Sequence, residues 1–280
     1  MDVNWFPGHM AKALRDIKDH LKQVDLVIET CDARIPDSSR NPELQKLIGQ
    51  KPRILLLNKA DLADPAITAR WISFYHAEQI MALACDSTHR KDLNALVRTI
   101  QEYGREKTER AAARGRVFRP IRVMVAGIPN TGKSTLINTL CGRKLAITAD
   151  KPGVTRQMNW IRTGGQIELL DSPGVLWPKL GGRDSQLHLA ATGAIRDEVL
   201  QVEEIAGETI KKLIMAYPIQ IEKRYSLTDR ECTAQTLLET AALHRGCLIS
   251  GGRPDVERFS RLFLDEFRAG KIGRISLEHP

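Results

Sequence analysis

The sequence lacks the features of membrane, secreted and zinc-binding proteins. No apolar run is long enough to cross a bilayer, and the N-terminus has no apolar core of the kind that a secretory signal needs. The five cysteines are widely spaced without a CxxC pair, which argues against a zinc site and favours reduced thiols in a cytosolic protein. We therefore expect a cytoplasmic protein with no membrane partner, and we expect it to be a monomer.

Length and charge narrow the expectation further. A chain of 280 residues has room for one large domain, or for one medium domain and a small one. Its net charge of +8 makes an anionic partner plausible. Nucleic acid is the commonest such partner, although a mildly basic surface is often only a solvated surface.

The order of expected elements predicts an α/β fold followed by helices. Expected strands alternate with expected helices in the first part of the chain: strands at 24–29, 53–57, 80–84, 121–126 and 167–170, and helices at 8–23, 66–78, 93–103 and 134–141. This alternation is typical of a parallel sheet, which binds ligands at the carboxyl ends of its strands. Beyond residue 187 the apolar spacing is helical, at 202–215, 234–244 and 256–267. We predict an α/β domain over residues 1–184 and a small all-α domain over residues 185–280.

A phosphate-binding loop lies between an expected strand and an expected helix. Residues 127–134 spell GIPNTGKS, which matches GxxxxGKS. Backbone N–H groups of such a loop and the following helix N-terminus form a concave anion site. We expect Lys133 to reach the β- and γ-phosphates and Ser134 to bind Mg²⁺, with Thr131, Gly132 and Thr135 also lining the nucleotide. A chance glycine turn is the alternative, and the strand–loop–helix context leaves it little weight.

A guanine-recognition motif precedes that loop. Residues 58–61 spell NKAD, and the Asp61 carboxylate can accept hydrogen bonds from guanine N1–H and the N2 amine. Adenine lacks this pair of donors, so selectivity for guanine follows. Asn58 and Lys59 are expected to support the base and the surrounding loops. Without the phosphate loop, a surface turn would be the better interpretation of the motif.

The order of these two motifs is the reverse of that in ordinary GTPases, which indicates a circularly permuted P-loop GTPase domain. The joined segment is expected at residues 104–122, where seven basic residues stand against two acidic ones. Chain termini usually lie at the surface and often near each other, so such a join is geometrically reasonable. A solvated helical linker and an RNA-contacting segment are equally good interpretations of these residues.

The switch elements lie between residues 152 and 175. Residues 171–174 spell DSPG and match the DxxG motif, in which Asp171 holds the Mg²⁺ shell and the Gly174 N–H senses the γ-phosphate. Thr155 is the candidate switch threonine that caps Mg²⁺. Val175 stands where Ras-like enzymes have a water-orienting glutamine, and valine cannot perform this task.

Taken together, the motifs resemble the YlqF family of circularly permuted GTPases. The resemblance includes the motif order, the opening WFPGHMAKA (5–13), the DARIP stretch (32–36), and segments 245–252 and 268–274. It implies a GTPase that binds GTP and GDP and acts late in assembly of the large (50S) ribosomal subunit. It also implies that the helical domain contacts ribosomal RNA.

The resemblance also implies roles for individual residues. His9 would orient the attacking water, and would act with Lys133 and Thr155 in catalysis; by its chemistry alone it would be taken for a cap or surface residue. Asn130 would help to hold K⁺ beside the phosphates, in addition to Mg²⁺. Asp86 and Ser87 align with a base-contacting loop that is normally Ser-Ala, so only a backbone role is expected there.

Two other functions stay open at this stage. The chain could be a nucleotide-gated RNA-binding protein whose hydrolysis is incidental. It could also be a GTPase of tRNA modification or translation, although the short helical tail shows no sign of a modification domain.

Overall fold

Six strands form a single sheet in the order β3-β2-β1-β4-β6-β5. The structure, a computed structural model, describes residues 8–113, 120–142, 146, 158–163 and 167–280. All neighbouring strands pair in parallel except β5, which runs antiparallel to β6. The strands are β1 (Leu26–Asp32), β2 (Arg53–Asn58), β3 (Ala82–Cys85), β4 (Ile121–Gly127), β5 (Asn159–Arg162) and β6 (Ile167–Asp171). The α/β fold expected from the sequence is thus confirmed.

Helices cover both faces of this sheet, as the alternation of apolar side chains requires. Val27 of β1 packs in a cluster with residues of α1 (Gly8–Leu21) and α2 (Pro42–Ile48). Its neighbour Ile28 points to the other face, into a cluster with α4 (Asn94–Ala112) and α5 (Lys133–Cys141). Successive side chains of a strand point to opposite faces, so a strand that is apolar throughout needs both layers. A third cluster joins α3 (Pro65–Ala77) to β2 and β3.

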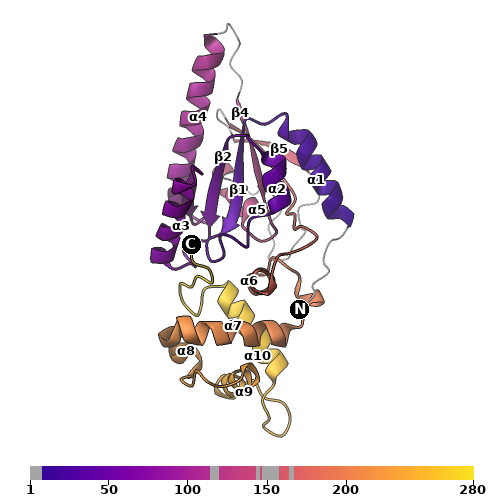
Figure 1. Ribbon diagram of the computed structural model, residues 1–280, viewed down its shortest axis with the longest axis vertical. Helices are drawn as coiled ribbons and strands as arrows, with labels where there is room; N and C mark the ends of the chain where they lie inside the picture. The colour runs from indigo at the N-terminus through magenta and orange to yellow at the C-terminus, as the bar shows by residue number, and fades with distance from the viewer. Residues whose placement is uncertain (1–7, 114–119, 143–145, 147–157, 164–166) are drawn as a thin grey trace.

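The connectivity explains the reversed motif order. Strand β4, which leads into the phosphate loop, lies beside β1 at the centre of the sheet, although three strands precede it in the chain. Helix α4 carries the chain back from the edge strand β3 towards this centre, and it extends well beyond the sheet (Figure 1). Each motif therefore has its usual position in the sheet, although the motifs follow one another in a different order along the chain.

The sequence-based boundaries were wrong mainly at α4, which continues to Ala112 rather than ending near residue 103. Its last turns are rich in Arg, Lys, Glu and Ala, which favour helix without an apolar face. The first half of the basic segment 104–122 is therefore helical, and residues 114–119 lie outside the described residues. The sequence analysis also missed α2, β5, α6 (Arg183–Ala191) and α8 (Pro218–Tyr225), all of nine residues or fewer.

The helical part lies against one end of the sheet domain, and its first helix, α6, lies on the side that faces the sheet (Figure 1). It consists of α6, α7 (Val202–Ala216), α8, α9 (Ala234–His244) and α10 (Val256–Arg268). Its core includes Tyr225, Phe259 and Phe263, and the buried carboxylate of Glu266 accepts hydrogen bonds from Arg224, Tyr225 and Arg245. One apolar cluster contains residues of both α1 and α10, so the two parts share a core. The boundary at residues 184 and 185 falls within α6 and stays a prediction.

Across the described residues, no helix combines the length and the apolar character that crossing a membrane would require.

Candidate nucleotide-binding site

Four loops meet at the carboxyl edge of the sheet. The NKAD motif (58–61) follows β2, residues 86 and 87 follow β3, the phosphate loop (127–134) follows β4, and DSPG (171–174) begins at the end of β6. These four strands are neighbours or near neighbours and run in parallel. Their carboxyl ends therefore bring together, at one edge, the described residues that the sequence analysis assigned to the nucleotide.

Asn58 joins three of these loops. Its side chain is buried, and its Nδ2 donates a hydrogen bond to the Thr131 carbonyl at 2.7 Å. Its Oδ1 accepts from the backbone N–H of Ser87 at 3.1 Å and from the Ser87 hydroxyl. Thr131 is held from the other side by Thr30, with 2.7 Å between the two hydroxyl oxygens. Asn58 thus links the phosphate loop to the base-side loop through hydrogen bonds to Thr131 and Ser87.

Two glycines permit the close approach of these loops. Gly132 has a φ of +84°, and a Cβ at that position would lie 2.2 Å from Asn58 Nδ2. At Gly174 a Cβ would lie 2.8 Å from the backbone of Pro129 and 3.0 Å from Lys133 Nζ. A side chain at Gly132 would strain the backbone and displace the Asn58 amide, and a side chain at Gly174 would push the phosphate loop away. The DSPG motif therefore lies directly against that loop.

Lys133 is buried under the phosphate loop. Its Nζ donates to the Ile128 carbonyl at 2.7 Å. Burial lowers the pKa of Lys133 to about 8, against the opposing effect of the nearby Asp171 carboxylate. A weakly solvated ammonium held by one carbonyl would gain much from phosphate oxygens, because hydrogen bonds between charged partners are the stronger ones.

Residues suited to a magnesium ion lie at the same place. Asp171 is buried at the end of β6, in register with Val125 of β4, and Ser134 lies in the first turn of α5. Carboxylate and hydroxyl oxygens are hard ligands of the kind that Mg²⁺ prefers. These residues fit the ion: Ser134 would bind it directly, and Asp171 would hold its shell of water molecules. Thr155, the third predicted ligand, lies outside the described residues.

The guanine side carries two carboxylates. Asp61 is exposed, and desolvation together with the nearby Asp86 carboxylate raises its pKa. Lys59 has a φ of +58°, and its Nζ lies 3.1 Å from the buried Asp32 carboxylate. Lys59 therefore fixes the start of the loop that carries Asp61.

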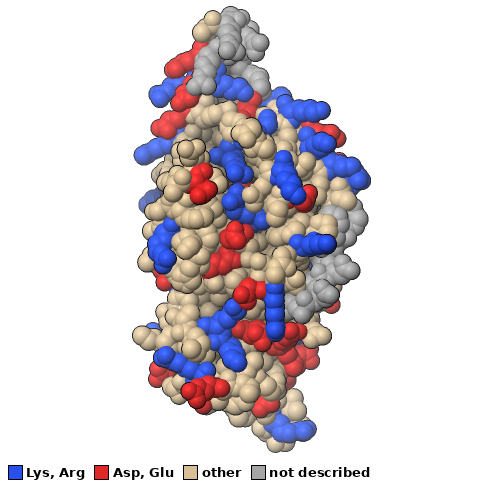
Figure 2. Space-filling model, in the orientation of Figure 1, with Lys and Arg blue, Asp and Glu red and all other residues tan. Residues whose placement is uncertain are grey.

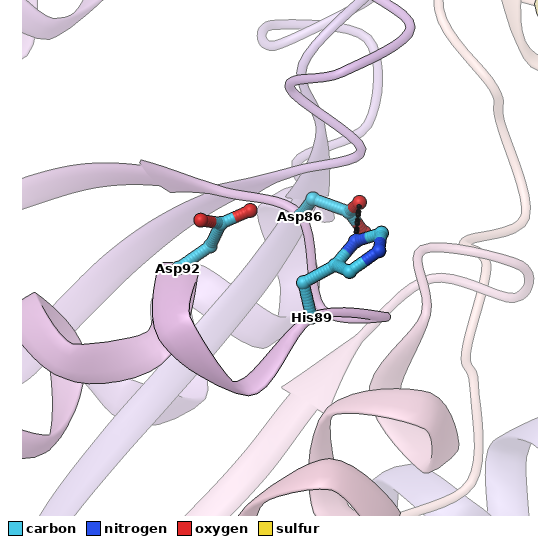
Figure 3. Close-up of side chains that lie close together, drawn as sticks. All are labelled: Asp86, His89 and Asp92. Atoms are coloured by element: carbon cyan, nitrogen blue, oxygen red, sulfur yellow. Dashed lines mark hydrogen bonds and ion pairs between the residues drawn. The ribbon is translucent and has the colours of Figure 1, made fainter.

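Asp86 is engaged by its own loop (Figure 3). Its Oδ1 accepts from the Thr88 N–H at 2.8 Å, and its Oδ2 lies 2.6 Å from His89 Nδ1. Although burial would raise the pKa of Asp86, the bonds from Thr88 and His89 hold it below its usual value. Asp92 completes a cluster with Asp86 and His89, in which Asp86 is half-buried and the other two are exposed. The Asp86 side chain is thus engaged within its own loop, and a backbone role for this position in base binding stays a prediction.

Asn130 connects the phosphate loop to the helical part. It has a φ of +59°, and its Nδ2 donates to the Gly193 carbonyl, just beyond α6, at 2.6 Å. The amide is thereby oriented by the helical part of the chain. The sequence offered no indication of this contact, because the two residues are far apart in the chain.

The residue after the DSPG motif is fixed in an apolar setting. Val175 is buried, its N–H donates to the Gly127 carbonyl at 3.2 Å, and its carbonyl accepts from Asn41 Nδ2 at 2.7 Å. It has no group that could orient a water molecule. His9 is the second residue of α1, and its side chain lies outside the described residues.

Two functional candidates, Asp32 and Arg34, received no role in the sequence analysis beyond the family resemblance. They form a bidentate ion pair with distances of 2.9 and 2.8 Å, and both are buried. Burial alone would raise the pKa of Asp32, but the charges of Arg34 and Lys59 hold it far below its usual value. Two opposite charges two residues apart, at the end of a buried strand, were the available sign of this pair.

Comparison with known proteins identifies the family. Residues 122–232 match the model of the 50S ribosome-binding GTPase family. Ribosome biogenesis GTPase A of Priestia megaterium is 44% identical over 281 residues, covering 100% of this chain and 98% of that protein. The chain belongs to the ribosome biogenesis GTPase A (YlqF) family.

More distant members agree over the same length. The Thermotoga maritima protein named ribosome biogenesis GTPase A is 32% identical, over 99% of this chain and 95% of that protein. The solved structure of GNP-bound YlqF from T. maritima has a TM-score of 0.68 and 28% identity, and the match covers 96% of this chain and 98% of that one. The circularly permuted P-loop GTPase fold predicted from the sequence is thus confirmed. The chain is a GTP-binding GTP hydrolase involved in ribosome biogenesis, and Mg²⁺ is the general cofactor of such GTPases.

Proposed function

We propose that GTP hydrolysis by this chain serves a late step in assembly of the large (50S) ribosomal subunit, and that the chain binds the precursor particle in a nucleotide-dependent way. Family membership supports this, because relatives that match the whole chain are named for ribosome biogenesis. The site then has three tasks: to recognise guanine, to hold the phosphates, and to hydrolyse the γ-phosphate only in the right context. We expect a protein with this function to be located in the cytoplasm.

Guanine and phosphate recognition are assigned to residues that the fold brings together. Asp61 would accept the guanine donors, and Lys59 would support the loop beneath it. Lys133 would neutralise the β- and γ-phosphates, while backbone N–H groups at the start of α5 bind them. Thr131, Gly132 and Thr135 complete the phosphate side, and Ser87 and Asp86 the base side. The observation that carries this assignment is the Asn58 side chain, which couples the two sides through Thr131 and Ser87.

GTP hydrolysis requires a group that orients the attacking water towards the γ-phosphate. Val175 is buried and apolar, so another group must act. His9 is the candidate within the chain, and Thr155 would respond to the γ-phosphate. Placement of His9 beside the γ-phosphate on the ribosomal particle would couple hydrolysis to assembly, as in other switches in which binding completes a site.

A potassium ion is proposed beside the phosphates, with Asn130 as its ligand. The hydrogen bond from Asn130 Nδ2 to Gly193 supports this role, because it fixes the plane of the amide at the phosphate loop. A monovalent cation there would stabilise negative charge that develops in the transition state.

The distribution of charge indicates where ribosomal RNA would be attracted. Residues 185–280 contain 13 Lys and Arg against 14 Asp and Glu. The positive excess of the chain therefore belongs to residues 1–184, and Figure 2 shows Lys and Arg spread over the sheet domain on the visible face. We infer that the sheet domain makes most of the phosphate contacts, and that the helical domain adds RNA or ribosome contacts of a less electrostatic kind.

One experiment tests the proposal as a whole. GTP turnover is measured with and without purified 50S precursor particles, in K⁺ and in Na⁺ at equal ionic strength. We expect slow intrinsic turnover, strong stimulation by the particles, and faster turnover in K⁺ that Asn130→Ala abolishes. Absence of stimulation by any large-subunit particle would contradict the proposed function, whereas equal rates in the two salts would remove only the potassium ion.

The rival interpretation, in which hydrolysis is incidental, is tested in cells. A variant that binds particles and GTP but does not hydrolyse it should fail to restore assembly in a strain lacking the protein. Full rescue by this variant would favour a nucleotide-gated RNA-binding protein.

A further inference from the structure

The loop that carries Asp61 is bound along its length by the end of the chain. We call residues 59–64 the guanine loop and residues 270–278 the C-terminal segment. Arg274 donates from Nη2 to the Ala60 carbonyl and from Nε to the Ala63 carbonyl, both at 2.9 Å. The Ile275 N–H donates to the Leu62 carbonyl at 2.9 Å. The carbonyls of the residues on either side of Asp61 are thus both bonded to the C-terminal segment.

The contact continues to the end of the guanine loop. The Asp64 N–H donates to the Ser276 hydroxyl at 3.2 Å, and a Cβ at Gly270 would lie 2.6 Å from a methyl of Leu62. The segment therefore follows the loop closely, from its second residue to its last.

The C-terminal segment is itself anchored to the body of the protein. Its Glu278 carboxylate accepts from the Asp37 N–H at 2.8 Å and lies 2.9 Å from His188 Nδ1. The Trp71 indole donates to the Glu278 carbonyl at 3.2 Å, and the Tyr217 hydroxyl to the Ser276 carbonyl at 3.1 Å. Because these anchors come from both parts of the chain, the segment is a fixed support for the guanine loop.

The start of the guanine loop is tied to the same helical part. Lys59 pairs with Asp32, and Asp32 pairs with Arg34. Arg34 Nη1 donates to the Phe267 carbonyl, in the last turn of α10, at 3.1 Å. A cation at the carboxyl end of a helix is also favoured by the helix dipole. The guanine loop is therefore linked to α10 at its first residue, Lys59, through Asp32 and Arg34. From Ala60 onwards it is linked to the C-terminal segment, which follows α10.

We propose that the C-terminal segment holds Asp61 in position for guanine, and that Arg274 is a positioning residue for nucleotide recognition. The proposal rests on the assignment of Asp61 as the guanine ligand. The physical reason is preorganisation: a loop already held in its binding conformation loses less conformational entropy when the ligand binds. Hydrogen bonds from Arg274 to carbonyls on both sides of Asp61 restrict the backbone at the residue that must face the base.

The test compares Arg274→Ala with Arg253→Ala, which removes the same charge from an exposed site between α9 and α10. Equilibrium dissociation constants are measured for GDP and for IDP, which lacks the N2 amine. We expect Arg274→Ala to weaken GDP binding roughly tenfold, the equivalent of one good hydrogen bond. IDP binding should weaken less, because it depends less on Asp61, so the preference for GDP over IDP falls. Arg253→Ala should match the parent.

Two further variants keep the outcome decisive. Arg274→Lys retains the charge but lacks the planar fork that bonds two carbonyls, so it should recover only part of the lost affinity. If Arg274→Ala weakens GDP and IDP equally, or leaves both unchanged, the positioning role is overturned. The variant Asp61→Asn distinguishes a failure of the positioning role from a failure of the proposed site. If Asp61→Asn binds xanthine nucleotides while Arg274→Ala binds GDP and IDP like the parent, only the role of Arg274 is wrong. If Asp61→Asn keeps its preference for guanine, the site and the positioning role are both wrong.

Discussion

At the scale of single residues, Asp61 decides which base is bound. Asp61→Asn replaces an acceptor with a side chain that offers a donor to the base, which complements xanthine rather than guanine. We expect the preference for GDP over XDP to change by about 10²-fold or more, since a binding site with unmatched polar groups rejects its ligand strongly. Competition binding with GDP, XDP and ADP measures this. Asp92→Asn, which neutralises an exposed carboxylate in the short 3₁₀ helix Arg90–Leu93, is the control. Equal affinity of the parent for ADP and GDP would contradict the assignment.

The protonation of Lys133 makes phosphate binding depend on pH. Burial holds the pKa of Lys133 at about 8 in the free protein, and bound phosphates would raise it by stabilising the ammonium. Binding therefore takes up a proton at pH values above the free pKa, and GDP affinity falls there by as much as about tenfold per pH unit. Below that pKa the amine is already protonated, so this contribution to the pH dependence disappears.

Calorimetry measures this proton uptake directly. Heats of GDP binding are compared in two buffers of different ionisation enthalpy, about one pH unit above the pKa and again below it. The heats should differ between buffers only at the higher pH. In Lys133→Arg, whose side chain stays charged, any remaining binding should show no such difference. Buffer-independent heats for the parent at the higher pH would show that Lys133 is already protonated without nucleotide.

His9 is the residue assigned to water orientation. His9→Ala should reduce particle-stimulated turnover by about 10²-fold or more, the usual scale for a positioned acid–base group. Single-turnover hydrolysis on saturating 50S particles measures this, with GTP and particle affinities measured alongside. His20→Ala is the matched control, because His20 lies on the same helix and its ring bonds to the Asp16 carbonyl. A His9 variant that binds normally and hydrolyses at the parent rate would leave the ribosome as the source of the missing group.

At the scale of elements, the Asp32–Arg34 pair joins the end of β1 to the end of α10. The side chains of Arg34 and Asp32 are 1% and 3% exposed, so Arg34→Ala would leave a buried carboxylate without its main partner. We expect the free energy of unfolding to fall by about 3–5 kcal/mol, as for other buried pairs that lose one member. Denaturant unfolding measures this loss.

A weaker ion pair between β2 and β1 is the control. Arg53 lies 3.7 Å from Glu29 and is 23% exposed, and Glu29 keeps Arg40 as a partner. Arg53→Ala should therefore cost about 1 kcal/mol or less. Equal losses in the two variants would mean that the link between β1 and α10 contributes no more than this weaker pair, in which Arg53 is partly exposed.

At the scale of the whole molecule, electrostatic attraction to the ribosome is expected from the sheet domain. The double variant Lys18→Glu with Lys22→Glu changes two exposed residues at the end of α1 and just beyond it. Particle binding should weaken, and its dependence on salt should become shallower by about 0.7–0.9 in logarithmic slope for each phosphate that is no longer neutralised. Binding across a series of salt concentrations measures this.

The control for that prediction changes the helical domain by the same charge. Lys211→Glu with Lys223→Glu alters two exposed residues there and should leave the salt dependence near that of the parent. A larger effect of this control than of the α1 variant would place the RNA-binding surface on the helical domain instead.

The structure also shows why removing the helical domain would be a poor test of its role. Gly193, Phe267 and Arg274 all bond to residues of the sheet domain. A chain that ends near residue 187 would therefore lose support for both Asn130 and the guanine loop. Impaired nucleotide binding is expected from such a truncation, so point variants separate ribosome docking from nucleotide recognition more cleanly.

Local patterns were enough to predict the α/β fold, the helical tail, the motif chemistry and the permuted order. Strand and helix periodicities depend on neighbouring residues, and GxxxxGKS and NKAD are each continuous in the chain. Short elements such as α2 were missed because their stability depends on a cap and on packing, as Asn41 shows by bonding both to the helix start and to the Val175 carbonyl.

Only the tertiary structure decided how the site is supported. The contacts of Asn58 with Thr131, of Asn130 with Gly193 and of Arg274 with Ala60 join residues separated by 73, 63 and 214 positions. The burial that lowers the pKa of Lys133 likewise depends on how strands far apart in the chain are assembled. Sequence motifs indicate which groups contact the nucleotide, because each motif is a short continuous stretch of residues with a recognisable chemistry. The groups that hold them in place are chosen by packing between distant segments, which no local pattern records.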